Sequence, residues 1–129
     1  MRTQELLEGI AIRGCGGDWP PHLEGLHYDS RAIQPGWAFV AIRGALLDGH
    51  DFIPQAVANG ARLILSELPP PTTGKVAWAQ VANARQALAQ AAANFFHHPA
   101  RQLELIGITG TNGKTTTAFL TEAMLRQAG

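Results

Sequence analysis

The stretch Gly107–Thr117, GITGTNGKTTT, carries the residue types of a phosphate-binding loop. Glycines let backbone amides turn toward oxyanions, and the start of a following helix adds the positive end of its dipole. In such a loop Lys114 would reach the terminal phosphates of a nucleotide. The Thr115 hydroxyl would hold a magnesium ion that bridges those phosphates. The stretch therefore predicts a nucleotide-binding function.

The glycine spacing of this loop is unusual. The common P-loop pattern has a glycine where this chain has Ile108, and the glycines fall instead at positions 107, 110 and 113. A glycine-rich turn followed by a chance Lys-Thr pair is the alternative interpretation. An apolar strand pattern over Leu103–Gly110 and a helical pattern over Lys114–Ala128 flank the loop in the right order, which favours phosphate binding.

Two polar stretches earlier in the chain allow both a structural and a functional interpretation. In Asp29-Ser30-Arg31, the aspartate can bond its own backbone and the arginine can pair with an acid, as in an ordinary turn. The stretch DGHD, residues 48–51, resembles a metal site, but a turn followed by a helix cap explains it better. His97 and His98 are adjacent and cannot serve one face of a helix as ligands.

The first hundred residues alternate strand and helix patterns and predict a compact α/β domain over residues 1–101. Strands are expected from Leu26 to the polar turn at Asp29, over Gly36–Gly44, over 62–67 and over 75–81, and loops over 14–25 and 68–74. Helices are expected over Thr3–Leu7, from a cap at Asp51 through Pro54 to Gly60, and from a cap at Asn83 to a stop at Pro99.

Residues 102–129 begin a second region, with a buried strand, the glycine loop and a last helix. The last helix is apolar over most of its circumference and is therefore expected to need neighbours that bury it. Its apolar residues are Phe119, Leu120, Ala123, Met124 and Leu125.

Composition restricts the possible partners. Ten basic and ten acidic residues give a formal net charge of zero, so we expect no nucleic-acid partner and no membrane partner. The single cysteine, Cys15, excludes an intramolecular disulfide, and its Gly-Cys-Gly-Gly setting predicts a turn. The N-terminus has no signal-peptide pattern, which predicts a cytoplasmic protein.

These motifs resemble the Mur ligases, which add amino acids to the peptidoglycan precursor. GITGTNGKTTT is similar to their ATP loop, including its departure from the common spacing. DSRAIQPGWAFVAIRGALLDGHDFIPQAVANGARLIL, residues 29–65, resembles the N-terminal domain of the later ligases of that pathway. Gly-Thr-Asn-Gly and the stretch FFHHPARQLELIGITG leading into it favour the ligase of the third step. The resemblance covers nearly the whole chain but only about the first quarter of the family's length.

The resemblance implies a small substrate domain over 1–101, then the first strand, P-loop and helix of a parallel-sheet ATPase domain, truncated at 129. The substrate domain of such enzymes holds the UDP end of the substrate, which maps here to Tyr28, Ser30, Ala45, Leu46 and Leu47. Tyr28 stands where the family often has a smaller aliphatic residue. The ATP loop maps to Gly110, Thr111, Asn112, Gly113, Lys114, Thr115 and Thr116, with Lys114 catalytic and Thr115 the magnesium ligand.

The implied reaction is the ATP-dependent addition of a third amino acid, meso-diaminopimelate or L-lysine, to UDP-N-acetylmuramoyl-L-alanyl-D-glutamate through an acyl phosphate. ATP is the co-substrate and Mg²⁺ the cofactor, and the full-length enzyme is expected to be a monomer. Because the family's adenine and amino-acid pockets lie further along, we expect residues 1–129 alone to be inactive. A fourth-step ligase, a non-catalytic UDP-sugar-binding module and an unrelated P-loop switch are the alternatives.

Overall fold

The computed structural model describes residues 1–69 and 74–128. The chain divides into two compact units, Met1–Pro99 and Ala100–Gly129. Part of the loop expected over 68–74 lies outside the described residues. Among the residues that are described, no helix is both long enough and apolar enough to cross a membrane.

The first unit is a five-stranded sheet with the strand order β1-β5-β4-β3-β2. The four strands β2 to β5 run parallel, and β1 pairs antiparallel with β5. The strands are β1 (Ile12–Gly16), β2 (Leu26–His27), β3 (Ala38–Val40), β4 (Leu63–Ser66) and β5 (Ala77–Val81). The sequence-based prediction of an α/β fold is confirmed.

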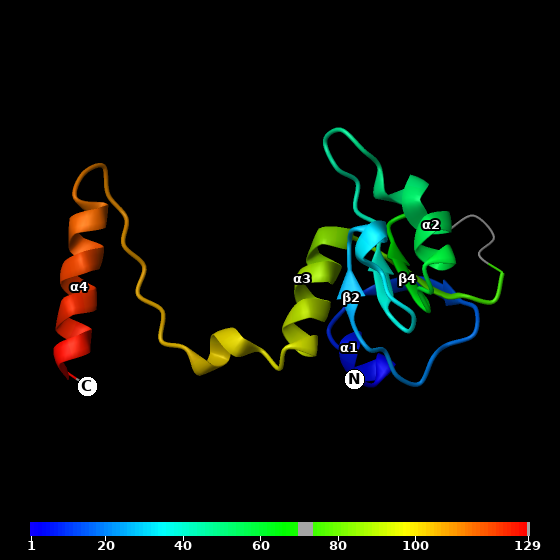
Figure 1. Cartoon of the computed structure of the whole chain (residues 1–129), viewed down its shortest axis with the longest axis horizontal. Helices are drawn as coiled ribbons and strands as arrows, with labels where there is room; N and C mark the ends of the chain where they lie inside the picture. Colours follow the sequence, from blue (N-terminus) through cyan, green and yellow to red (C-terminus); the bar gives the residue numbers. More distant parts are fainter. Residues whose placement is uncertain (70–73, 129) are drawn as a thin grey trace. The chain divides into compact units, whose positions relative to one another are not determined.

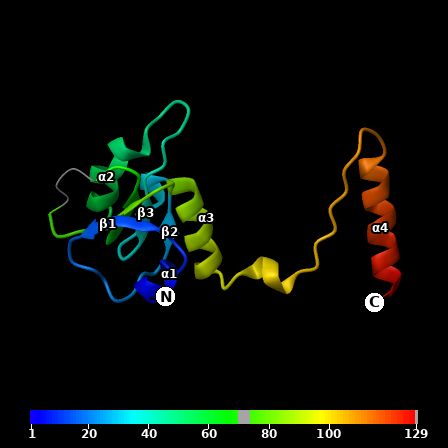
Figure 2. The ribbon, with the colours of Figure 1, turned by 180° about the vertical axis from the view of Figure 1, so that it is seen from behind.

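Helices cover both faces of this sheet, with α2 on one side and α1 and α3 on the other (Figures 1 and 2). The helices are α1 (Thr3–Leu6), α2 (Ile53–Ala58) and α3 (Ala84–Phe95), with 3₁₀ turns η1 (Ser30–Ala32), η2 (Gly49–Phe52) and η3 (Pro99–Gln102). Because successive strand residues point to opposite faces, Val40 packs toward α3 while Phe39 packs toward α2. Both side chains are fully buried.

Strand β1 was missed because the sequence of residues 14–25 predicts a loop. That prediction is wrong for residues 14–16, including the turn at Cys15, and is confirmed for residues 17–25, which form no helix or named strand. Glycines normally weaken strands, but Gly16 lies against the Trp78 ring. A Cβ at Gly16 would come within 2.9 Å of Trp78 Nε1. The cross-strand tryptophan therefore needs the glycine.

Two helix termini differ from the expectation. Asp48, rather than Asp51, accepts a hydrogen bond from the backbone of His50 and caps η2, which leads directly into α2. Helix α3 begins at the expected cap, since Asn83 accepts from the Gln86 amide at 3.0 Å. It ends at Phe95, before Pro99, because His97 and His98 adopt left-handed φ angles of 56° and 52°.

The second unit contains α4, Lys114–Ala128, as the sequence predicts. The strand expected over Leu103–Gly110 does not form: this stretch has no strand structure, and Leu105 is 79% exposed. A strand needs a neighbouring strand to bond its amides and carbonyls, and residues 100–128 supply none.

Candidate functional site

A cavity of about 400 Å³ lies beyond the carboxyl ends of the parallel strands β2 and β3. Three segments form its wall: the turn that follows β2, the segment that follows β3, and the η2–α2 helix. The lining residues are Tyr28, Asp29, Ser30, Arg31, Ile42, Leu47, Gly49, Phe52 and Gln55. We call this the turn cavity. Open α/β sheets commonly bind ligands at this end of their strands.

The turn after β2 is fixed by its own polar groups. Asp29 accepts from the Arg31 amide at 3.0 Å, and the Arg31 guanidinium contacts both carboxylate oxygens, with Nη2 2.6 Å from Oδ2. The side-chain hydrogen bond from Arg31, with that from its backbone amide, lowers the pKa of Asp29 to about 2. The expected turn chemistry is therefore present, and Asp29 is itself the acid that pairs with Arg31.

Ser30 is held from two sides in this turn. Its hydroxyl donates to Gln55 Oε1 at 2.7 Å, and its carbonyl accepts from Asn59 Nδ2 at 2.8 Å. Both partners come from α2 or its end, so the helix fixes Ser30 against the cavity wall. Ser30 is only 4% exposed.

Tyr28 presents an aromatic surface to the cavity. Its ring stacks on the His27 ring, with the centroids 5.0 Å apart and the planes 16° apart. His27 is itself fixed, because its Nδ1 accepts from the Asp29 amide at 2.8 Å. Tyr28 remains 59% exposed, so its ring is available to a ligand.

The loop between Arg43 and Asp48 carries the other predicted substrate residues. The Gly44 amide donates to the Leu47 carbonyl at 2.9 Å, and Arg43 and Asp48 face each other at its base at 3.6 Å. Of the three predicted residues Ala45, Leu46 and Leu47, only Leu47 lines the cavity. Leu46 points into solvent, 96% exposed.

The DGHD stretch forms the turn and helix start that the sequence favoured. Asp48 accepts from the His50 amide at 3.0 Å and lies 2.5 Å from His50 Nδ1. The hydrogen bond from the His50 backbone, and then the one from its side chain, lower the pKa of Asp48. His50 Nε2 is buried without a hydrogen-bond partner among the described residues.

In the second unit, the glycine loop turns directly into α4. Gly110 and Gly113 have φ angles of 156° and 77°, conformations that glycine adopts more easily than other residues. The Lys114 ammonium folds back and donates to the Gly110 carbonyl. The Thr117 amide donates to the Gly113 carbonyl at 2.9 Å, closing the first turn of the helix. The loop residues from Thr109 to Thr117 are all exposed.

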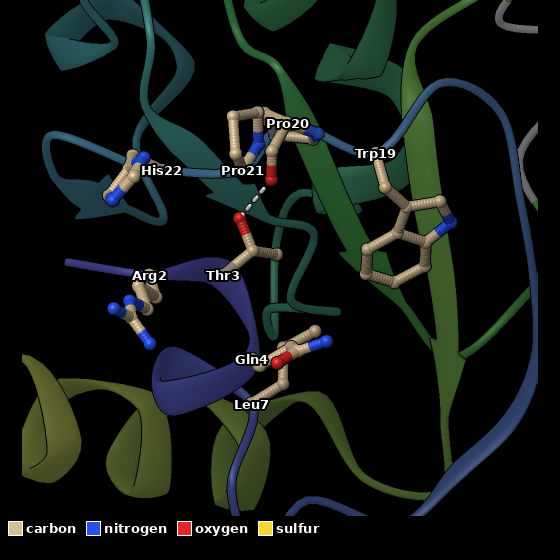
Figure 3. A pocket seen from close by; sticks show the side chains of 8 residues that line it. All are labelled: Arg2, Thr3, Gln4, Leu7, Trp19, Pro20, Pro21 and His22. Carbon is tan, nitrogen blue, oxygen red and sulfur yellow. Dashed lines mark hydrogen bonds between the residues drawn. The ribbon is translucent and has the colours of Figure 1, made fainter.

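A second cavity in the first unit, of about 450 Å³, lies between α1 and the segment 19–22 (Figure 3). It is slightly larger than the turn cavity but contains none of the predicted site residues. The Thr3 hydroxyl in its wall already donates to the Pro20 carbonyl. The turn cavity, which contains Tyr28, Ser30 and Leu47, is therefore the better candidate.

Sequence reasoning missed four residues of the turn cavity: Ile42, Gly49, Phe52 and Gln55. Ile42, Phe52 and Gln55 lay within patterns interpreted as a strand and a helix, where side chains are usually assigned to packing. Only Gln55 carried a usable signal. It is a polar residue two positions after Ile53 on α2, and therefore lies off the buried face of that helix.

Comparisons with known proteins give a consistent family. Residues 22–96 match the family described as "Mur ligase family, catalytic domain". The chain is 51% identical over 132 residues to a UDP-N-acetylmuramyl-tripeptide synthetase of Deinococcus radiodurans, covering 100% of this chain and 27% of that protein. It is 40% identical to a UDP-N-acetylmuramoyl-L-alanyl-D-glutamate–2,6-diaminopimelate ligase of Geobacter metallireducens, covering 100% of this chain and 25% of that protein.

Solved structures of Mur ligases share the fold. A MurF from Acinetobacter baumannii aligns with a TM-score of 0.67 at 34% identity, over 90% of this chain and 25% of its own. A Thermotoga maritima MurF ligase, solved in complex with ADP, aligns with a TM-score of 0.52 at 32% identity, over 71% of this chain and 21% of its own. The chain spans about a quarter of the length of the curated relatives that it matches. It belongs to the Mur ligase family.

Proposed function

We propose that this chain forms the substrate-binding and phosphate-binding front of an ATP-dependent amide ligase of cytoplasmic peptidoglycan precursor synthesis. The reaction would join a third amino acid, meso-diaminopimelate or L-lysine, to UDP-N-acetylmuramoyl-L-alanyl-D-glutamate. One observation carries the proposal: relatives matching the whole chain at 40% and 51% identity are named for this step. The MurF structures are less similar, at 32% and 34% identity, so the fourth-step alternative is weaker.

The first unit would hold the UDP end of the substrate in the turn cavity. Tyr28, Ser30 and Leu47 line that cavity and would contact the ligand directly. Ala45 and Leu46 lie on the same loop, and we assign them to the substrate through this loop. The cavity of about 400 Å³ is within the usual size range of small-molecule sites.

The second unit would hold the phosphates of ATP on the residues Gly110 to Thr116. Lys114 would exchange its contact with the Gly110 carbonyl for the terminal phosphates, where its charge opposes the charge of the transferring group. Thr115 lies exposed in the first turn of α4, and a hydroxyl there is a suitable oxygen ligand for Mg²⁺. When bound, Mg²⁺ would neutralise phosphate charge.

The reaction would then proceed in two steps, phosphorylation of the substrate carboxylate and displacement of the phosphate by the amine. The substrate's D-glutamate carboxylate oxygen forms a bond to the γ-phosphorus of ATP while the bond from that phosphorus to the bridging oxygen breaks, releasing ADP. The amine of the incoming amino acid adds to the carbonyl carbon of the acyl phosphate and loses a proton. The tetrahedral intermediate then expels inorganic phosphate and leaves the amide. Lys114 and the loop amides act on the first step, in which phosphoryl charge moves.

Lys114 provides the test. In the protein encoded by the full reading frame that contains this chain, Lys114→Ala should lower kcat for tripeptide formation by at least about 100-fold, as the loss of one positioned hydrogen-bond donor to developing negative charge does elsewhere. The assay supplies ATP, UDP-muramoyl dipeptide and either diaminopimelate or lysine. Lys75→Ala is the matched control, since Lys75 is exposed and lies outside the glycine loop.

Three results would contradict the proposal. Equal activity of Lys114→Ala and the unaltered protein would contradict the proposal that the glycine loop binds the phosphates of ATP. Addition of D-alanyl-D-alanine to a tripeptide substrate, without tripeptide formation, would favour the fourth step. Binding of UDP without ligation of any amino acid would favour a binding module.

A further inference from the structure

The hydrogen bond between Ser30 and Gln55 determines what the wall of the turn cavity offers to a ligand. A hydroxyl has one proton to donate and two lone pairs that accept. The Ser30 proton is already donated to Gln55 Oε1 at 2.7 Å, so the Ser30 oxygen remains as an acceptor. It therefore has no proton left for a phosphate oxygen.

Gln55 supplies the opposite group beside it. Its amide oxygen is turned to Ser30, which leaves the Nε2 protons of the same amide as donors. Among the described residues, nothing accepts a hydrogen bond from Gln55 Nε2. Because Ser30 and Gln55 both line the cavity, its wall presents an acceptor and a donor next to each other.

This pair is complementary to one kind of chemical edge. A diphosphate at neutral pH carries only acceptors, and so it does not match the Ser30 oxygen. An imide edge, with an N–H next to a C=O, matches both groups at once. The Tyr28 ring, stacked on His27 and lining the same cavity, adds a flat surface suited to a planar heterocycle.

We propose that Gln55 is a specificity-determining residue that turns the Ser30 hydroxyl into an acceptor and, together with it, reads the imide edge of a pyrimidine base. The inference rests on the proposed function, because it assumes that the turn cavity holds the uridine end of the substrate. Gln55 acts in two ways: it positions Ser30 through the hydrogen bond, and its Nε2 contacts the base carbonyl. The diphosphate then lies away from α2.

The test compares two ligands, UDP and UDP methylated at N3 of the base, by calorimetric titration of the 129-residue chain. Methylation removes the N3–H group that would donate a hydrogen bond to the Ser30 oxygen. It should therefore weaken binding to the unaltered chain about tenfold, the cost of one unmade hydrogen bond. The ratio of the two affinities is the readout, because a general loss of structure weakens both ligands alike.

Two variants at Gln55 separate the positioning role from a merely structural one. Gln55→Ala removes the acceptor, so the Ser30 proton turns toward the ligand and the methylation ratio should fall below about threefold. Gln55→Glu keeps a carboxyl oxygen for the Ser30 proton, so the ratio should stay near tenfold while UDP itself binds more weakly. Gln86→Ala, on the exposed face of α3, is the matched control and should behave as the unaltered chain.

The outcomes distinguish the inference from the function it rests on. A folded, unaltered chain that does not bind UDP overturns the proposed substrate site and the inference with it. UDP binding with no methylation effect, or with the same ratio in Gln55→Ala as in the unaltered chain, overturns the inference alone. Thermal unfolding of each variant verifies the fold, which should persist because Gln55 is exposed on α2 and alanine favours helices.

Discussion

The two units of this chain use similar apolar residues with opposite results. In Met1–Pro99 the large apolar side chains of the central strands β3 and β4 are fully buried, among them Phe39, Ile64 and Leu65. In Ala100–Gly129 the residues Leu105, Phe119 and Met124 are between 67% and 79% exposed. The difference is one of partners: the first unit has a sheet with helices on both faces, and the described residues of the second unit form no sheet.

The comparison shows which kinds of structure are local. Helix α4 forms without burial because its hydrogen bonds close within the helix. The stretch before it, Leu103–Gly110, has the sequence of a buried strand but no neighbour to bond, and it stays irregular. The glycine loop is local in the same sense, since its contacts, such as Lys114 with Gly110, lie within four residues.

Phenylalanine truncation gives the largest expected difference between the units. Phe39→Ala removes a fully buried ring between the sheet and α2 and should cost about 3–5 kcal/mol. Phe119→Ala removes a ring that is 67% exposed and should change the unfolding of the first unit by less than about 0.5 kcal/mol. Urea unfolding followed by tryptophan fluorescence measures both, because Trp19, Trp37 and Trp78 all lie in the first unit. Equal effects would show that Phe119 is buried in solution.

Two asparagine variants, one in each unit, test the same difference in burial and should show a smaller difference in the free energy of unfolding. Asn94 is 8% exposed, and its Nδ2 donates to the carbonyls of Leu6 and Glu8 at 3.0 and 2.9 Å, joining α3 to the end of α1. Asn94→Ala leaves these carbonyls unpaired and should cost about 2–3 kcal/mol. Asn112→Ala, in the exposed glycine loop, should cost less than about 0.5 kcal/mol. A near-neutral Asn94→Ala would mean that water replaces the amide.

The sequence predicted those parts of the fold that depend on short-range chemistry. Asn83 as a cap, Pro54 in the first turn of α2 and the turn at Asp29 need only a few neighbouring residues. Strand β1 was missed because its glycines make sense only beside Trp78, which lies far away in sequence. The cap was assigned to Asp51 instead of Asp48 because both aspartates flank the same helix start, and only the backbone geometry selects one.

The residues of the candidate site also differ in whether the sequence alone could identify them. Tyr28, Ser30 and Leu47 were identified from a resemblance, and the structure brings them to one cavity. Gln55 could not be assigned in advance, because its role depends on a hydrogen bond to Ser30, which is 25 residues away. A helix pattern shows that Gln55 lies off the apolar face of α2, but not what it meets there.

The smallest expected effect is on the pKa of Asp29, which forms an exposed ion pair with Arg31 in the first unit; the exposed pair of Glu122 with Arg126 on α4 is the comparison. The Arg31 side chain, and after it the Arg31 amide, hold the pKa of Asp29 at about 2, against an ordinary value of 3.8. Because the folded pKa is depressed, the stabilisation of the turn is fully present above pH 3.8 and is lost as the pH falls through about 2.

Carbon-13 NMR titration of the Asp29 carboxyl should therefore give a midpoint near 2 in the unaltered chain. Arg31→Ala should raise that midpoint toward 3.8 but not fully, since the backbone amide at position 31 still donates to Asp29. Arg126→Ala, which breaks the pair with Glu122 on α4, should leave the Asp29 midpoint unchanged. A midpoint near 3.8 in the unaltered chain would mean that the Asp29–Arg31 contact is absent in solution, and that the turn presenting Ser30 is held by α2 alone.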